Sequence, residues 1–161
     1  MGLEMAMDRI LLEQSLALVA ADDPDFTVRF YERLFADHPD VKSLFGENIR
    51  PQATMLQEAI VAVLEHLDDP AWLQSSLGSL GRVHASLGVT PKMYGWVATT
   101  LVATMADIAG PEWTDAMAKE WNEALTVVAA MMLDAYPPES PGQEPSTTDQ
   151  QLLSGPGRGR G

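Results

Sequence analysis

The chain has 161 residues, 46% of them hydrophobic, which is enough for one folded domain with a buried core. It contains no cysteine, which excludes disulfides and thiolate metal sites and fits a cytoplasmic location. The formal net charge of −13 argues against nucleic acid as a partner, because cationic surfaces bind phosphate backbones. The N-terminus lacks the continuous apolar core of a signal peptide, and no apolar run reaches the roughly 18 residues of a membrane span.

Helical periodicity and helix-boundary residues predict an all-α domain of six or seven helices over residues 1–136, with no convincing strand. Asp23 before Pro24 is typical of an N-cap followed by a first-turn proline, and Pro111 is expected to open the last helix. Gly88 and Gly110 are expected to end helices. The expected helices cover 3–20, 24–37, a short turn after Pro39, 51–67, 70–88, 90–110 and a last segment beginning at 111.

The C-terminal stretch 137–161 holds 5 of the 11 prolines and 5 of the 12 glycines. Such a composition cannot bury enough apolar surface to order itself, so the sequence predicts a disordered tail. A docking peptide carrying Arg158 and Arg160 is the alternative interpretation.

One apolar helix face contains a histidine. Positions 73, 77, 80, 84 and 87 form a stripe at helical spacing in which leucines surround His84. Spacing alone leaves two interpretations open, a hydrogen-bonded core histidine and a metal ligand. The other two histidines have simpler expectations. His38, beside a proline among charged residues, is expected to be a solvated loop residue, and His66 is expected to lie in the last turn of its helix, where it interacts favourably with the helix dipole.

Two further polar side chains interrupt apolar faces on other helices. Tyr31 adds a phenol to the inward face of the second expected helix, and Gln52 lies one turn before Leu56 in the next. A boundary tyrosine and an exposed first-turn glutamine remain possible interpretations. Together with His84, however, they offer a nitrogen ligand, a hydroxyl donor and an amide, which are the groups that line a haem-iron pocket.

Three motifs, in this order, carry a family resemblance. The stretches "FYERLFADHPDVKSLF", "VHASLGVTPKMYGWV" and "GPEWTDAMAKEWNEAL" resemble the bacterial single-domain globins and the globin domain of flavohaemoglobins. The resemblance covers roughly residues 5–136. It implies a globin fold around haem b, with six to seven helices.

On the proximal side, the resemblance implies that His84 is the axial iron ligand. Tyr94, ten residues later, and Val97 match proximal-side and pocket-wall positions. The family often has a basic residue directly before the histidine that meets a haem propionate. Here that residue is Val83, with Arg82 one position earlier.

On the distal side, the resemblance implies that Tyr31 donates a hydrogen bond to dioxygen and that Gln52 assists it. Leu56 matches the distal leucine, and Phe45 matches the phenylalanine that packs on the porphyrin. The segment between Phe45 and Gln52 is shorter than in typical flavohaemoglobins. An ungapped alignment would put Met55 at the glutamine position instead.

The chain departs from the flavohaemoglobin pattern in its last helix. That pattern has a glutamate that hydrogen-bonds the proximal histidine and tyrosine and makes the iron more reactive. Counted from Trp121, the position is Tyr136 here, and the nearest acid is Asp134. Strong peroxidase-like character is therefore not expected.

The resemblance implies a haem b protein that binds dioxygen, and also NO and CO, for transport or storage. Nitric oxide dioxygenation with a separate NAD(P)H-dependent reductase is the enzymatic alternative, in which Tyr31 and Gln52 would be the distal groups. A further alternative is a haem-free interaction module or a sensor on the same fold.

Overall fold

The structure, a computed structural model, describes residues 8–137 and confirms the all-α expectation, with helices and no strand in this range. Residues 1–7 and, apart from Pro137, the expected tail lie outside the described residues. The elements are α1 (Arg9–Asp22), α2 (Phe26–Asp37), the 3-10 helix η2 (Pro39–Leu44), α3 (Arg50–Glu65), α4 (Pro70–Ser86), α5 (Pro91–Ala109), the 3-10 turn η3 (Gly110–Glu112) and α6 (Asp115–Asp134).

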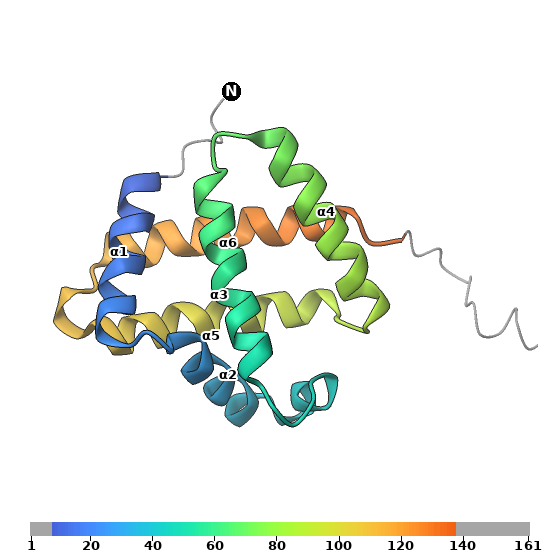
Figure 1. Cartoon of the computed structure of the whole chain (residues 1–161), viewed down its shortest axis with the longest axis horizontal. Helices are drawn as coiled ribbons and strands as arrows, with labels where there is room; N and C mark the ends of the chain where they lie inside the picture. Colours follow the sequence, from blue (N-terminus) through green and yellow to red (C-terminus); the bar gives the residue numbers. More distant parts are fainter. Residues whose placement is uncertain (1–7, 138–161) are drawn as a thin grey trace, which may run out of the picture.

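The helices pack in crossing pairs rather than as a parallel bundle. Helices α5 and α6 pack on each other, α2 packs on α5 and α3, and α4 packs on α6 (Figure 1). In the view of Figure 1, α3 crosses in front of α5 and α6, while α4 descends to its right. The C-terminal half of α4 thereby comes to the same side of the molecule as the end of α6.

The starts of α2 and α6 differ from the sequence prediction, which placed them at Pro24 and Pro111. Asp23 ends α1 as its C-cap and accepts a hydrogen bond from the Asp25 amide at 3.0 Å, so the chain turns there and α2 begins only at Phe26. Pro111 lies in the turn η3, and α6 begins at Asp115 because the Thr114 side chain accepts from the Met117 amide at 3.1 Å. In both places an Asp or Thr side chain fixed the local turn, and the proline did not open the helix.

Buried polar side chains join the helices at fixed points. The Thr27 hydroxyl donates to the Ala53 carbonyl at 2.9 Å and so links α2 to α3. The Trp121 indole donates to the Ser15 hydroxyl at 2.7 Å and links α6 to α1. Because buried donors are costly to leave unpaired, these bonds help to fix how the helices cross.

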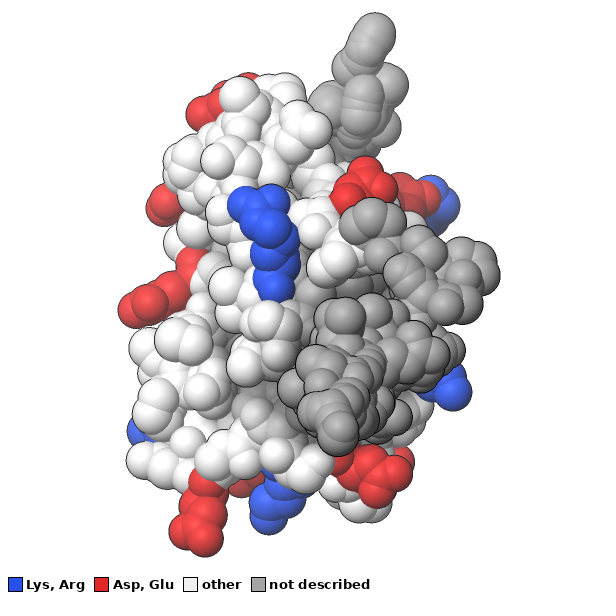
Figure 2. Space-filling model, turned by 90° about the vertical axis from the view of Figure 1, so that its right-hand side faces the viewer, with Lys and Arg blue, Asp and Glu red and all other residues white. Residues whose placement is uncertain are grey.

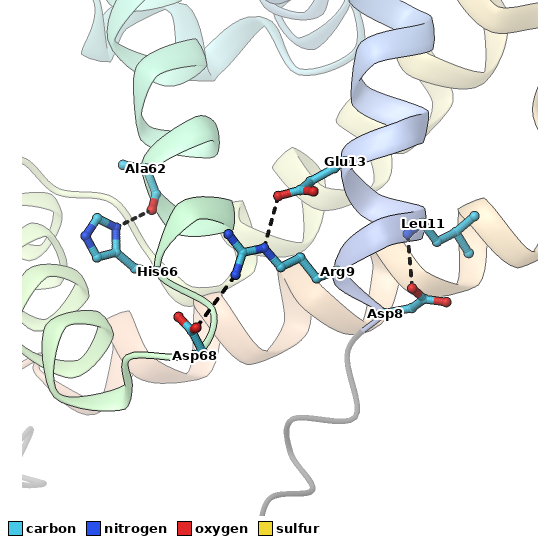
Figure 3. A network of polar contacts seen from close by, with 7 residues as sticks. All are labelled: Asp8, Arg9, Leu11, Glu13, Ala62, His66 and Asp68. Carbon is cyan, nitrogen blue, oxygen red and sulfur yellow. Dashed lines mark hydrogen bonds and ion pairs between the residues drawn. The ribbon is translucent and has the colours of Figure 1, made fainter.

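Surface ion pairs fasten the start of α1. Arg9 contacts Glu13 on its own helix at 3.0 Å and reaches Asp68, in the connection between α3 and α4, at 3.8 Å (Figure 3). Nearby, the His66 Nδ1 lies 2.8 Å from the Ala62 carbonyl at the end of α3. The His66 ring also stacks on Trp72, so this histidine is occupied by structural contacts.

The buried apolar residues form two clusters instead of one. The larger joins α1, α2, α3, α5 and α6 around fully buried residues such as Phe26, Phe30 and Met105. The smaller is centred on Leu73 and Leu77 of α4 and Met132 of α6. Helix α4 therefore packs on α6 through Leu73 and Leu77 in its N-terminal half and through the buried Gly81 in its C-terminal half.

One glycine permits the close approach of α4 and α6. A Cβ built on Gly81 would lie 2.2 Å from the Met132 carbonyl oxygen, which no side chain can do without moving a backbone. At Gly78, one turn earlier, a Cβ would make only ordinary contacts of 3.8 and 3.9 Å. The crossing beside His84 thus requires a glycine at one position and not at the other.

Candidate functional site

An apolar cavity of about 200 Å³ lies between the two clusters. Its walls come from α3, α4, α5 and α6, and they are made almost entirely of aliphatic side chains. The lining residues are Leu56, Ala59, Ile60, Val63, Leu64, Leu67, Leu77, Leu80, His84, Met93, Tyr94, Val97, Ala98, Leu101, Trp121, Ala124, Leu125, Val128, Ala129 and Met132.

Three lining residues carry polar nitrogen or oxygen atoms in their side chains, and two of them are paired. The Trp121 indole is bonded to Ser15, and the Tyr94 hydroxyl lies 3.0 Å from the Tyr136 hydroxyl. The His84 Nδ1 lies 2.9 Å from the Leu80 carbonyl. A carbonyl can only accept, so Nδ1 carries the proton and Nε2 is the basic nitrogen. Among residues 8–137, Nε2 has no hydrogen-bond partner.

The histidine stripe on α4 is buried at one end and open at the other. Leu73 and Leu77 are 7% and 4% exposed, whereas Leu80 and Leu87 are 36% and 61% exposed. Val83 beside them is also exposed. Figure 2 views the side of the molecule on which α4 lies in Figure 1, and most of the described surface drawn there is uncharged. The apolar face that the sequence predicted therefore exists, but among residues 8–137 only its first half is buried.

The backbone around His84 is held by the way α4 ends. Gly88 adopts a positive φ of 90°, its amide donates to the Ala85 carbonyl at 3.1 Å, and the Val89 amide donates to the His84 carbonyl at 3.0 Å. These two bonds form a Schellman motif, which needs glycine at the left-handed position. The predicted stop at Gly88 is confirmed, and it fixes the carbonyl of the histidine itself.

Tyr94 lies beside His84 and is half-buried. The centres of the two rings are 6.1 Å apart. Burial, and then the hydrogen bond with Tyr136, raise the pKa of Tyr94 above its ordinary value. The phenol consequently stays protonated at neutral pH.

Tyr31 belongs to an aromatic cluster next to the cavity. Its ring lies 4.8 Å from Phe30, 5.3 Å from Phe45 and 5.9 Å from Phe35, measured between ring centres. Burial raises the pKa of Tyr31 to about 12, so its hydroxyl is a neutral donor. Among the described residues this hydroxyl has no hydrogen-bond partner, and Tyr31 does not line the cavity.

The predicted distal residues are distributed between the cavity and this cluster. Leu56 lines the cavity, and it packs against the same apolar cluster as Tyr31 and Phe45. Gln52 lies in the first turn of α3, half-buried and outside the cavity lining. Met55, the competing position, is 56% exposed. The helix therefore turns the Gln52 and Leu56 side inward and the Met55 side outward.

The predicted proximal residues are only partly brought together. Val97 and Tyr94 line the cavity with His84. Arg82 does not, because residues two apart on a helix do not share a face, and its guanidinium donates to the Ser79 hydroxyl at 3.2 Å on the exposed side. Phe45, expected against the porphyrin, lies beside Tyr31 and Phe35.

Several lining residues were visible as periodic helix faces but were not assigned to a site. Val63 continues the face of α3, Leu67 lies in the turn after that helix, and Leu125, Val128 and Met132 form the face of α6. Their spacing indicated burial, and only the fold shows that they surround one cavity. His38, expected in solvent, is instead half-buried, with its ring stacked on Trp96 at 4.1 Å.

No group of three or more His, Cys, Asp or Glu side chains within residues 8–137 is arranged to hold a metal ion. None of the described helices is long and apolar enough to cross a membrane. The cavity wall contains one imidazole nitrogen, His84 Nε2, that has no hydrogen-bond partner among the described residues. The neutral hydroxyl of Tyr31 belongs to the aromatic cluster against which Leu56 of the wall packs.

Comparisons with known proteins show the family of the chain. The family model described as Globin matches residues 28–132. A flavohemoprotein from Rhodopirellula baltica is 33% identical over 129 residues, which are 78% of this chain and 31% of the relative. One from Vibrio cholerae is 27% identical over 127 residues, 77% of this chain and 32% of the relative. The chain therefore spans about a third of the length of these relatives.

Solved structures show the same fold. A bacterial globin from Campylobacter jejuni superposes with a TM-score of 0.68 at 22% identity, covering 79% of this chain and 92% of that one. An engineered carbene transferase, described as a nitric oxide dioxygenase candidate from Rhodothermus marinus, superposes with a TM-score of 0.67 at 24% identity. It covers 91% of this chain and 93% of its own.

Proposed function

Because the chain belongs to the globin family, we propose that it binds haem b between α3 and α4, with His84 as the axial ligand through Nε2. The observation that carries the proposal is the open half of the α4 stripe. Exposed Leu80 and Leu87 flank His84 in the stripe, and the His84 imidazole, whose Nε2 has no hydrogen-bond partner among the described residues, lines an apolar cavity. A flat apolar cofactor would cover that surface.

The residues present fit a haem group chemically. The lining is aliphatic, which suits a porphyrin, and the Leu80 carbonyl holds the His84 proton on Nδ1 so that Nε2 points its lone pair away from the helix backbone. A backbone carbonyl is a common partner for the second nitrogen of a metal-bound histidine. When bound, the haem would supply ferrous iron with an open position for a diatomic gas.

The distal donor in this proposal is Tyr31. Its hydroxyl is protonated and without a partner among the described residues, and its ring packs on Phe45 in the apolar cluster against which the cavity residue Leu56 also packs. A hydrogen bond from it to dioxygen would contribute about 1.5–3 kcal/mol, roughly ten- to a hundredfold in affinity. Gln52 would assist it from the first turn of α3.

The dioxygen-binding proposal is tested by stopped-flow dissociation from the haem-loaded protein. Tyr31→Phe is expected to raise the dioxygen off-rate at least about tenfold, while Gln52→Ala has a smaller effect in the same direction. Met55→Ala is the matched control, because that side chain is exposed on the same helix. An off-rate that Tyr31→Phe leaves unchanged would remove Tyr31 from the distal role.

Nitric oxide dioxygenation is the second candidate, favoured by the flavohemoprotein relatives. Combining nitric oxide with dioxygen to give nitrate takes one electron per turnover. We propose that a separate NAD(P)H-dependent reductase would supply it to this chain. Sustained NADH-driven nitric oxide consumption with an added flavin reductase would support the enzyme. Consumption that stops after one equivalent would support the carrier.

A further inference from the structure

A single tyrosine ties the end of α6 to the turn that follows His84. The Tyr136 hydroxyl lies 2.7 Å from the Val89 carbonyl and 3.0 Å from the Tyr94 hydroxyl. A phenol has one proton, and a carbonyl can only accept it. Tyr136 therefore donates to Val89, and Tyr94 donates to Tyr136.

Val89 is also the residue that closes the Schellman motif on His84. Its amide donates to the His84 carbonyl at 3.0 Å, while its own carbonyl receives the Tyr136 hydroxyl. One residue thus joins the backbone of the histidine to the last helix. The Tyr136 bond is half-buried and spans 47 positions in the chain, so it is a tertiary contact and not part of a local turn.

The same phenol pair keeps the Tyr94 proton away from the His84 ring. Since Tyr94 donates to Tyr136, it does not donate to the imidazole, although the two rings are 6.1 Å apart, and Nδ1 keeps its own proton. The His84 Nδ1 is left with the Leu80 carbonyl as its partner.

We propose that Tyr136 is a positioning residue that acts through Val89 and Tyr94 to hold the turn after His84 and to keep the imidazole on a neutral backbone acceptor. The first half of this proposal concerns the protein alone. The second half, the effect on the axial bond, rests on the proposed ligation of haem by His84. The two halves are measured separately below.

The first measurement is hydrogen exchange of the full chain, with and without haem. Tyr136→Phe removes the hydroxyl and keeps the ring. We expect amide exchange in residues 84–90 to become about three- to tenfold faster, the usual worth of one neutral hydrogen bond, with little change in α2. Thr126→Val is the matched control, because it deletes another α6 hydroxyl that bonds only the Asn122 carbonyl of its own helix. Equal exchange in the Tyr136→Phe variant and the wild type would refute the proposal that the Tyr136–Val89 hydrogen bond holds this turn.

The second measurement is the iron–histidine stretching band of the ferrous, haem-loaded protein by resonance Raman spectroscopy. Tyr136→Phe is expected to shift or broaden the band and to speed haem loss about three- to tenfold. Tyr94→Phe keeps the Tyr136–Val89 bond and is expected to change the band less. A band and a haem-loss rate identical to the wild type, in a Tyr136→Phe protein that is merely less stable, would reduce Tyr136 to a structural role and refute the proposal. A wild type that takes up no haem would instead refute the proposed function and leave the exchange result standing.

Discussion

Helices α2 and α4 both present an apolar face to the middle of the molecule, but among the described residues only the face of α2 is buried along most of its length. Five residues of α2 are buried, and its aromatic rings contact one another and Phe45. On α4 the stripe is buried at Leu73 and Leu77 and then opens, so that Leu87 is 61% exposed. The same kind of sequence pattern therefore gives a buried apolar face on α2 and a partly exposed one on α4.

This difference indicates that a cofactor would bind against the second half of α4. An aliphatic stripe that ends in solvent loses the free energy of burial that its residues would otherwise contribute, about 1.5–3 kcal/mol for each large side chain. A cofactor placed against the second half of α4 would recover it. We therefore predict that the stability of the C-terminal half of α4 depends on haem and that the stability of α2 does not.

Haem removal should give the largest effect. At a haem concentration a thousandfold above the dissociation constant, binding stabilises the folded state by about 4 kcal/mol, which corresponds to roughly 10–20 °C in Tm for a domain of this size. In hydrogen exchange, protection should fall mainly in the C-terminal half of α4 and stay high in α2. A uniform loss of protection in both helices would contradict the comparison.

Gly81→Ala should be the most damaging of the small substitutions. A Cβ at this position meets the Met132 carbonyl at 2.2 Å, so α4 must move away from α6, at about 2–3 kcal/mol or more. Gly78→Ala is the control, because its Cβ makes ordinary contacts and the helix gains about 0.5–1 kcal/mol from losing a glycine. Urea unfolding of the two variants should change in opposite directions, and equal behaviour would show that the crossing is not tight.

Leu87→Ala separates an exposed surface residue from a covered one. In the haem-free protein this change should alter the free energy of unfolding by no more than about 0.5 kcal/mol. In the loaded protein it should speed haem loss about five- to thirtyfold, equivalent to about 1–2 kcal/mol of burial. Ile10→Ala, an exposed position on α1, is the control and should leave haem loss unchanged. Equal haem-loss rates in the wild type and Leu87→Ala would mean that the open face is not covered by haem.

The buried phenol of Tyr31 gives a pH dependence. Its pKa is raised to about 12 by burial, so folding favours the neutral form. The stability that this shift provides is fully present below about pH 10 and is lost as the pH rises toward 12. By about pH 11 the loss amounts to about 1.4 kcal/mol. Tyr31→Phe lacks a titrating group here. The stability difference between the two proteins should therefore change by that amount between about pH 9 and about pH 11, and a constant difference would refute the shift.

Much of the fold could be predicted because helix periodicity survives in the structure. The apolar faces predicted for residues 51–67, 90–110 and 111–136 supply most of the cavity wall. The starts of α2 and α6 could not be predicted from their prolines, because the decisive bonds come from Asp23 and Thr114. His84, Tyr94, Leu56 and Val97 were predicted and meet at the cavity.

Other parts of the site depend on contacts that no single helix reveals. Gly81 is required only because Met132 approaches it from another helix, and Tyr136 matters only because Val89 lies within reach of its hydroxyl. Arg82 was selected by its place in the chain, yet the turn of the helix takes it to the exposed side. Sequence neighbours of a ligand are poor guides to what shares its pocket when the ligand lies on a helix.

The most direct test of the central claim is the absorption spectrum of the haem-supplied protein in the ferric, dithionite-reduced and carbon monoxide-treated states, compared with His84→Ala. The account predicts a strong Soret band that moves on reduction and again with carbon monoxide. In His84→Ala the band should be lost or altered and should return when imidazole is added. A folded, helical protein that shows no Soret band, or a His84→Ala variant with the wild-type spectrum, would contradict ligation by His84.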